Sequence, residues 1–203
     1  MPELILPGSA GRIEARYSPR KEDTAPIALI LAPHPRAGGH MNHPVAVQLF
    51  HLFMKRGFNV LRFNFRGVGG SAGSYDEGRG EEADALAVIA YGRTRWPQAA
   101  LWLGGFSFGA AVTVLAAASA QPARLVLVAP GITKIDVSQA APPTCPWLIV
   151  QGDADEVVPA DVVLGWAAQL TPAPQIALLP GAGHFFHGRI NELREAVLRF
   201  MTP

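Results

Sequence analysis

The sequence is poor in cysteine and in charged residues. Its one cysteine, Cys145, allows no intrachain disulfide and suits a reducing compartment. The 17 Lys and Arg residues nearly balance the 16 Asp and Glu residues, for a net charge of +1, and they form no basic run. Nucleic acids and anionic membranes are therefore disfavoured as partners.

Long apolar stretches are missing as well. None approaches the roughly 18 residues that a membrane-spanning helix needs. The opening stretch, MPELILP, has no basic region, and its apolar run is too short for a signal peptide. These absences predict a protein of the cytoplasm.

The sequence has no convincing cofactor pattern. His34, His40 and His43 match no zinc spacing, and no cysteine or carboxylate joins them. Residues 67–72 match the G-x-G-x-x-A fingerprint of dinucleotide-binding proteins, but no helix begins there. Nor does a suitable acidic residue end a strand about 20 residues later. We therefore expect neither a metal ion nor an organic cofactor.

Apolar residues are abundant, at 49% of 203 residues. This content and length predict one compact α/β domain, residues 1–203. The alternation of expected strands and helices predicts a mostly parallel sheet of about eight strands with helices on both faces. We expect the first two strands to form a hairpin. The expected strands are residues 4–6, 12–17, 27–32, 60–63, 101–103, 125–128, 147–150 and 175–179, and the expected helices are residues 43–56, 80–95, 160–169 and 190–200, with a further helix directly after Ser107.

Residues 105–109 read Gly-Phe-Ser-Phe-Gly, between a short apolar strand and an Ala-rich helical stretch. A G-x-S-x-G pattern in this context is typical of a nucleophile elbow, which holds a serine hydroxyl above a parallel sheet. So tight a turn strains the serine backbone, and side chains two positions away on either side would collide with the strand or the helix. Gly105 and Gly109 remove those side chains, so Ser107 is the predicted nucleophile.

A nucleophilic serine needs a neutral imidazole to take its proton and an anion behind the imidazole. In this topology the acid follows the strand two beyond the nucleophile, and the base follows the last strand. The first position offers the carboxylates Asp153, Asp155 and Glu156, and the second offers His184 and His187. Chain order thus predicts a triad and leaves its acid and base open among these residues.

Together these features resemble the α/β-hydrolases, and more narrowly compact bacterial hydrolases related to dienelactone hydrolase and small serine carboxylesterases. The resemblance covers essentially the whole chain and is clearest from Ile27 to Phe186. The segments that carry it are residues 33–39 (PHPRAGG), 62–71 (RFNFRGVGGS), 105–109 (GFSFG), 152–155 (GDAD) and 183–186 (GHFF).

The resemblance implies roles for individual residues. A Gly-x-x-Asp pattern ahead of Val-Pro selects Asp155 as the acid, and a Gly-x-x-His pattern selects His184 as the base. The oxyanion hole needs two backbone N–H groups, which these enzymes take from the residue after the nucleophile and from the loop after the third strand. Here those are the N–H groups of Phe108 and Arg36, with Pro35 in place of the commoner glycine. We expect the Arg36 side chain to be solvated rather than to select anionic substrates.

The resemblance also bears on the substrate. Such enzymes commonly insert a cap between the sixth and seventh strands, but residues 129–146 leave no room for one. Without a cap, Ser107 would lie in a shallow cleft, and Phe106, Phe185 and Phe186 are candidate walls. A shallow cleft favours short acyl chains.

We therefore expect a serine hydrolase that cleaves small esters through an acyl-enzyme, as a monomer or homodimer whose partner is a small-molecule ester. The serine disfavours the haloalkane dehalogenase and epoxide hydrolase branches, which use aspartate, and the strict dienelactone hydrolase type, which uses cysteine. A thioesterase and a peptidase or amidase are alternatives within the fold. A non-catalytic binding protein is a further alternative, disfavoured because no triad residue or elbow glycine is lost.

Overall fold

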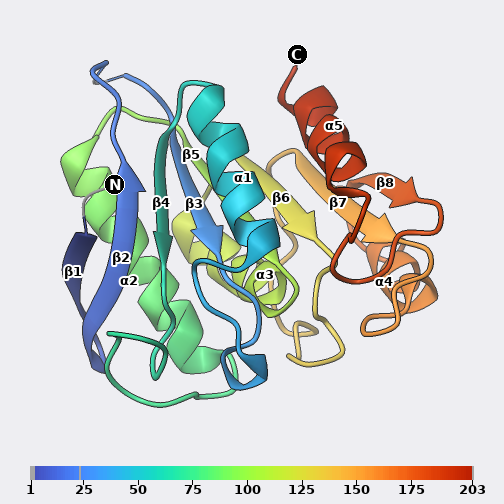
Figure 1. The fold of residues 1–203 in the computed structure, drawn as a ribbon, viewed down its shortest axis with the longest axis horizontal. Coiled ribbons are helices and arrows are strands. Elements are labelled where there is room, and N and C mark those ends of the chain that lie inside the picture. The colour runs from blue at the N-terminus through green and yellow to red at the C-terminus, as the bar shows by residue number, and fades with distance from the viewer. Residues whose placement is uncertain (1–2, 23, 203) are drawn as a thin grey trace.

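The computed structural model describes residues 3–22 and 24–202 (Figure 1). The strands within these ranges are β1 (Glu3–Gly8), β2 (Gly11–Ser18), β3 (Ile27–Leu31), β4 (Asn59–Phe63), β5 (Leu101–Phe106), β6 (Arg124–Val128), β7 (Trp147–Gly152) and β8 (Gln175–Leu179). The α-helices are α1 (Pro44–Lys55), α2 (Arg79–Arg95), α3 (Phe108–Ala120), α4 (Ala160–Ala167) and α5 (Ile190–Met201). A short 3-10 helix, η1 (Pro35–Ala37), follows β3.

The strands form one sheet in the order β1-β2-β4-β3-β5-β6-β7-β8. β2 is antiparallel to both of its neighbours, β1 and β4, and all other neighbouring strands are parallel. β1 and β2 form the expected hairpin, with Gly8 opposite Gly11 at the turn. The carboxyl ends of the parallel strands meet at one edge of the sheet, which is where α/β proteins of this kind place their sites.

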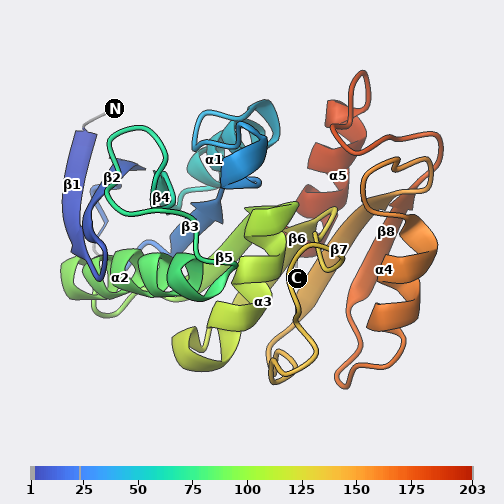
Figure 2. The same ribbon diagram turned by 90° about the horizontal axis from the view of Figure 1, so that it is seen from below.

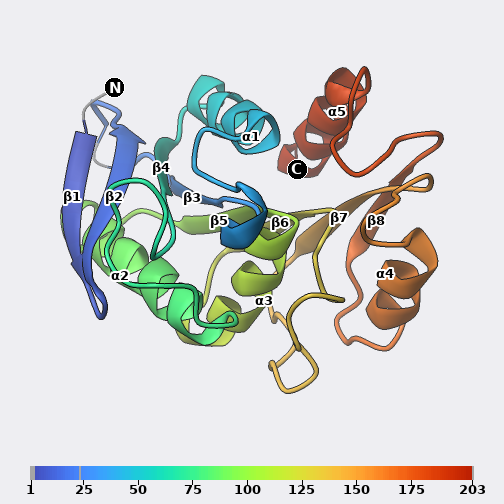
Figure 3. The ribbon, with the colours of Figure 1, turned by 60° about the horizontal axis from the view of Figure 1, so that its bottom comes forward.

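Helices cover both faces of the sheet (Figure 3). α1 and α5 pack on one face around Ile30, Phe53 and Val197. α2, α3 and α4 pack on the other face in a core that includes Leu31 and Val112. β3, β4 and β7 are buried over their whole length, which explains why their sequences are dominated by apolar residues rather than alternating with polar ones. The expected α/β-hydrolase architecture is confirmed.

β5 differs from the sequence expectation, because it continues past residue 103 to Phe106. Glycine weakens a strand locally, and Gly104 and Gly105 therefore argued for an earlier end. In the folded sheet both residues are paired on either side, to β3 through Ile30 and Leu31 and to β6. Tertiary pairing overrides the local preference and carries the strand directly to the serine.

The connection between β6 and β7, residues 129–146, contains no helix or strand (Figure 2). The chain therefore builds no cap domain there, as the sequence predicted. No helix in the described ranges is long and apolar enough to cross a membrane.

The loop after β4 is fixed by buried polar groups. Asp84 on α2 accepts hydrogen bonds from Nε and Nη2 of Arg66, at 3.1 and 2.8 Å, and from the Arg66 N–H at 2.9 Å. Asn64 accepts from the N–H of Met41 at 2.7 Å and donates to Glu14 at 2.8 Å. These bonds hold the loops after β3 and β4 to α2 and β2, so the borders of the site rest on the scaffold.

Candidate active site

Ser107 lies between the end of β5 and the start of α3, with φ 54° and ψ −119°. This positive φ is strained for a residue with a Cβ atom. A Cβ at Gly105 would lie 2.4 Å from the carbonyl oxygen of Gly109, and one at Gly109 would lie 2.3 Å from that of Ala32. Both distances are too short for a side chain, so the two glycines are what allow the turn.

The Ser107 hydroxyl is part of a buried hydrogen-bonded chain. Its Oγ lies 2.9 Å from Nε2 of His184, and Nδ1 of His184 lies 2.8 Å from Oδ2 of Asp155. The three residues come from the ends of β5, β7 and β8 and are only 2–8% exposed. With the Nδ1 proton directed to the carboxylate, Nε2 is free to accept the serine proton.

Asp155 is held by more than the imidazole. Its Oδ1 accepts the N–H groups of Val157 and Val158 at 2.9 and 2.7 Å, and its Oδ2 accepts from Nε2 of Gln151 at 3.1 Å. Burial by itself raises the pKa of Asp155, but the hydrogen bonds from His184, Val158 and Val157 together outweigh it and lower the pKa below its ordinary value. Asp155 therefore stays an anion behind the imidazole.

The other carboxylates of this loop point to different partners. Asp153 accepts the N–H of Gly181 at 2.6 Å, and Glu156 accepts the backbone N–H of His184 at 3.1 Å. Both brace the loop that carries His184 without touching its ring. His187 is exposed, and its ring is tilted against that of Phe185, with ring centroids 5.8 Å apart. Among these residues the structure brings together Ser107, Asp155 and His184.

The two predicted oxyanion-hole donors differ in their surroundings. Phe108 is the first residue of α3, so its N–H has no carbonyl partner within the helix. The N–H of Arg36 donates to Nδ1 of His34 at 3.1 Å. Arg36 can therefore serve a substrate oxygen only by sharing or releasing this bond, and its assignment stays a prediction.

A cleft of about 150 Å³ opens onto the serine. The residues that line it are Pro33, His34, Ala37, Gly39, His43, Ser107, Phe108, Lys134, Val157, His184 and Phe185. Of the three predicted walls, only Phe185 lies here. Phe106 and Phe186 are fully buried and lie outside the lining, because Phe106 stacks under His43 and Phe186 packs in the core against α5.

Two of the three phenylalanines that lie close to Ser107 or His184 in sequence therefore do not line the cleft. Lys134 and Val157 also line the cleft, and neither was predicted from the sequence. Val157 is two residues from Asp155, so proximity could have suggested it. Lys134 is brought in by the β6–β7 connection, and no local pattern marks it.

The three histidines of residues 34–43 share one arrangement. Nδ1 of His34, His40 and His43 accepts the backbone N–H two residues further on, at 3.1, 3.1 and 3.4 Å. One nitrogen of each ring thereby holds a backbone N–H, and the described residues contain no group of His, Cys, Asp and Glu able to hold a metal ion. Burial, followed by the neighbouring histidines, lowers the pKa of His43 to about 4, so this cleft residue is neutral at neutral pH.

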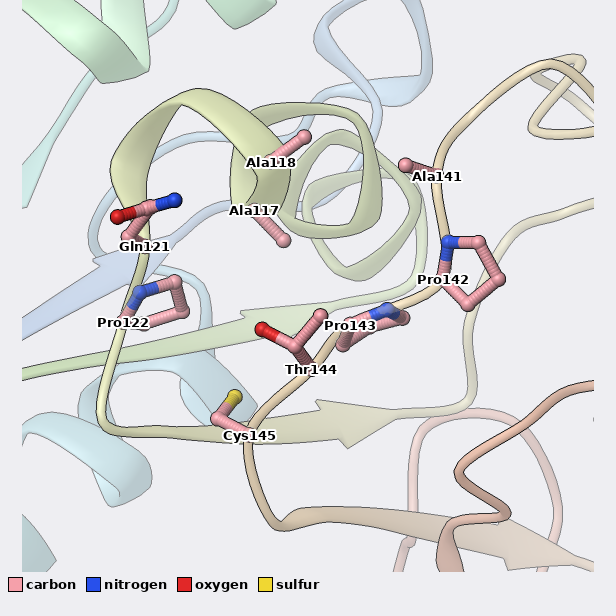
Figure 4. Close-up of a pocket in the computed structure, with 9 residues that line it drawn as sticks. All are labelled: Ala117, Ala118, Gln121, Pro122, Ala141, Pro142, Pro143, Thr144 and Cys145. Atoms are coloured by element: carbon pink, nitrogen blue, oxygen red, sulfur yellow. The ribbon is translucent and has the colours of Figure 1, made fainter.

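A second hollow, of about 190 Å³, lies at the opposite end of the sheet (Figure 4). It is formed by the end of α3 and by residues 141–145, with Cys145 on its floor. Burial raises the pKa of the Cys145 thiol, which keeps it protonated and a poor nucleophile. Cys145 is half-buried rather than a core residue, and it takes no part in the active site.

Comparison with known proteins agrees with the α/β-hydrolase fold. A family model described as X-Pro dipeptidyl-peptidase (S15 family) matches residues 12–141. An uncharacterized protein of Rickettsia prowazekii is 36% identical over 207 residues, which cover 97% of this chain and 87% of the relative.

Two solved structures are similar over their whole length. An α/β serine hydrolase homologue from Coxiella burnetii has a TM-score of 0.93 at 38% identity, covering 99% of this chain and 97% of that one. A member of the α/β serine hydrolases without a lid, from Xanthomonas campestris, has a TM-score of 0.91 at 38% identity, covering 98% of this chain and 92% of that one.

Proposed function

Because this chain belongs to the α/β-hydrolase superfamily of serine hydrolases, we propose that it cleaves small carboxylic esters through an acyl-enzyme intermediate. The observation that carries the proposal is the hydrogen-bonded chain from Ser107 through His184 to Asp155. It supplies a nucleophile, a base and an orienting anion in the geometry that acyl transfer needs.

In the first half of the reaction, Ser107 Oγ attacks the ester carbonyl while Nε2 of His184 takes the hydroxyl proton. Asp155 stabilises the imidazolium and keeps the ring oriented. The carbonyl oxygen, now negative, accepts hydrogen bonds from the backbone N–H groups of Phe108 and Arg36. To donate to the substrate, the Arg36 N–H gives up its hydrogen bond to Nδ1 of His34. His184 then gives its proton to the leaving alcohol as the C–O bond breaks.

In the second half, His184 takes a proton from a water molecule, which attacks the acyl carbonyl and forms the new C–O bond. The proton passes to Ser107 Oγ as the acid departs, and the enzyme returns to its first state. The small cleft supports a small substrate, because its volume of about 150 Å³ is below the roughly 300–1,000 Å³ of sites that enclose drug-sized ligands.

A peptidase is the second candidate, favoured by the match to the X-Pro dipeptidyl-peptidase model. The match ends at residue 141, before Asp155 and His184. A dipeptidyl-peptidase substrate begins with an α-amino group, which is largely protonated at neutral pH. The cleft presents Lys134 to it and no carboxylate side chain among the described lining residues, so the charges favour an ester.

The test combines labelling with turnover. We expect a fluorophosphonate probe to label the protein covalently, and Ser107→Ala to lose the label while Ser138→Ala, at an exposed serine of the β6–β7 connection, keeps it. The wild type should hydrolyse 4-nitrophenyl butyrate much faster than glycyl-prolyl-4-nitroanilide. Faster anilide cleavage would favour the peptidase, and no labelling of a folded protein would indicate a non-catalytic member of the superfamily.

A further inference from the structure

The charge on the cleft wall comes from one residue. Among the lining residues that the structure describes, Lys134 is the one Lys, Arg, Asp or Glu. Lys134 lies in the β6–β7 connection, where its N–H donates to the carbonyl of Gly131 at 2.9 Å. The Gly131 N–H donates to the Ser107 carbonyl at 2.9 Å, so the segment that carries the lysine is bonded directly to the nucleophile elbow.

The carboxylates closest to the triad do not neutralise this lysine. The Asp155 carboxylate accepts hydrogen bonds from His184 and from two backbone N–H groups, and Glu156 accepts the backbone N–H of His184. Glu81 is buried and accepts the N–H groups of Asp76 and Gly78. No carboxylate in the described ranges lies within 4.0 Å of the Lys134 ammonium.

Lys134 also borders a neighbouring hollow, and that side is acidic. Glu77, Glu82 and Asp136 line this acidic hollow, which is distinct from the hollow around Cys145, together with Arg79 and Tyr75. Lys134 thus lines two hollows, one with acidic side chains and one that opens onto Ser107. A flexible lysine can turn toward whichever side offers an anion.

A second cation lies beside the cleft. The Arg36 guanidinium is 5.5 Å from the ring centroid of Tyr75, which in turn packs 5.0 Å from the ring of His34. Burial lowers the pKa of His34, and Arg36 and Lys134 lower it further while Glu81 opposes them. The fields of both cations therefore reach the cleft wall.

The rest of the cleft is mainly apolar. Val157 and Phe185 are 38% and 40% exposed although both are large hydrophobic residues. The cleft thus has apolar walls, a cation on one side and Ser107 at its base.

We propose that Lys134 makes this cleft selective for esters that carry a carboxylate close to the scissile bond. The inference rests on the proposed function and names its substrate class. The substrate carboxylate would lie against the Lys134 ammonium while the apolar part of the ester covers Val157 and Phe185. Since the pair is exposed to water, its contribution is modest, and we expect about threefold to tenfold in kcat/KM.

The experiment compares mono-4-nitrophenyl adipate with 4-nitrophenyl hexanoate, after subtraction of enzyme-free hydrolysis. The anionic-to-neutral ratio of kcat/KM should fall about threefold to tenfold in Lys134→Gln, recover in Lys134→Arg, and stay unchanged in Lys55→Gln on α1. The wild-type ratio should also fall as salt is raised to about 0.5 M, because salt screens exposed charges. A parallel pair, 4-carboxyphenyl butyrate and phenyl butyrate, reports whether the alcohol side carries the carboxylate.

The two proposals fail in different ways. Hydrolysis of the neutral ester with an unchanged ratio for both substrate pairs in Lys134→Gln overturns the role of Lys134 and leaves the esterase proposal standing. Failure of the wild type to hydrolyse any of these esters overturns both. A higher ratio in Lys134→Gln would mean that the lysine does not attract the substrate carboxylate, which likewise overturns its role.

Discussion

Ser107, His184 and Asp155 come from distant parts of the chain, and each is prepared by its own neighbours. Two glycines let Ser107 adopt its positive φ, and the Glu156 carboxylate holds the backbone N–H of His184. Asp155 keeps its charge because backbone N–H groups and the imidazole donate to it. At the scale of single residues, the arrangement of the proposed triad depends on these supporting bonds as well as on the three side chains themselves.

The choice of acid can be tested by two matched substitutions. Asp155→Asn should lower kcat/KM for 4-nitrophenyl butyrate by roughly 10³- to 10⁴-fold, because the imidazole loses its orienting anion and adopts the wrong tautomer. Asp153→Asn should cost far less, since Asp153 holds only the Gly181 N–H. If Asp153→Asn were the more damaging change, Asp155 would not be the acid.

His43 should make stability depend on pH. Its folded-state pKa, about 4, lies below its ordinary value of 6.5, so the unfolded chain takes up the proton first. Its contribution to the free energy of unfolding is therefore complete above about pH 6.5 and is lost as pH falls toward about 4. Asparagine keeps an acceptor for the helix cap but cannot titrate.

We therefore expect the Tm of the wild type to fall more steeply than that of His43→Asn between about pH 6.5 and pH 4. Scanning calorimetry of both proteins across this range measures the difference. Parallel curves would show that His43 titrates alike in the folded and unfolded chains.

At the scale of elements, the nucleophile depends on how closely α3 approaches β3. The first turn of the helix passes so near the strand end that a Cβ at Gly109 would also lie 2.6 Å from the carbonyl oxygen of Leu31. α4 is under no such restriction, because nothing lies within 4 Å of a Cβ at Gly165. Close packing therefore requires a glycine at position 109 of α3, whereas a side chain fits at position 165 of α4.

Gly109→Ala and Gly165→Ala should accordingly have effects of opposite sign. Gly165→Ala should stabilise the protein by about 0.4–1 kcal/mol, because alanine favours the helix and restricts the unfolded chain. Gly109→Ala should destabilise it and reduce fluorophosphonate labelling, because the helix must move away from β3. Denaturant midpoints and labelling rates provide the measurements, and a stable, fully labelled Gly109→Ala protein would contradict the packing argument.

At the scale of the whole molecule, the short β6–β7 connection leaves the site without a lid. The acyl chain can then be covered only by the cleft walls, and each buried methylene contributes about 0.8 kcal/mol. Methylenes beyond the cleft contribute little.

We expect kcat/KM for 4-nitrophenyl esters to be greatest at roughly two to six acyl carbons. The rate should rise smoothly through the concentration at which substrate forms micelles, because no lid has to open at an interface. An optimum beyond about ten carbons, or a jump in rate on micelle formation, would require a deeper tunnel or a moving cover.

The sequence by itself determined the order of strands and helices, the mostly parallel sheet, the missing cap and the position of Ser107. The elements and the strained serine follow from short-range physics: apolar runs, helix and turn chemistry, and glycines spaced around the serine. The missing cap followed from the family resemblance together with the short segment 129–146. The motifs of the resembling family further selected Asp155 and His184, which the structure places in hydrogen-bond contact.

Only the tertiary structure decided which side chains surround the serine. Phe106 and Phe186 lie within two residues of Ser107 and His184 in sequence, yet the sheet and α5 bury them, and of the three predicted walls only Phe185 reaches the cleft. The folding of separate loops toward one another decides which group accepts the Arg36 N–H, and it places Lys134 in the lining of the cleft. Local patterns set the backbone, whereas the wall of a cleft is formed by contacts between distant segments, whose relative placement no local pattern encodes.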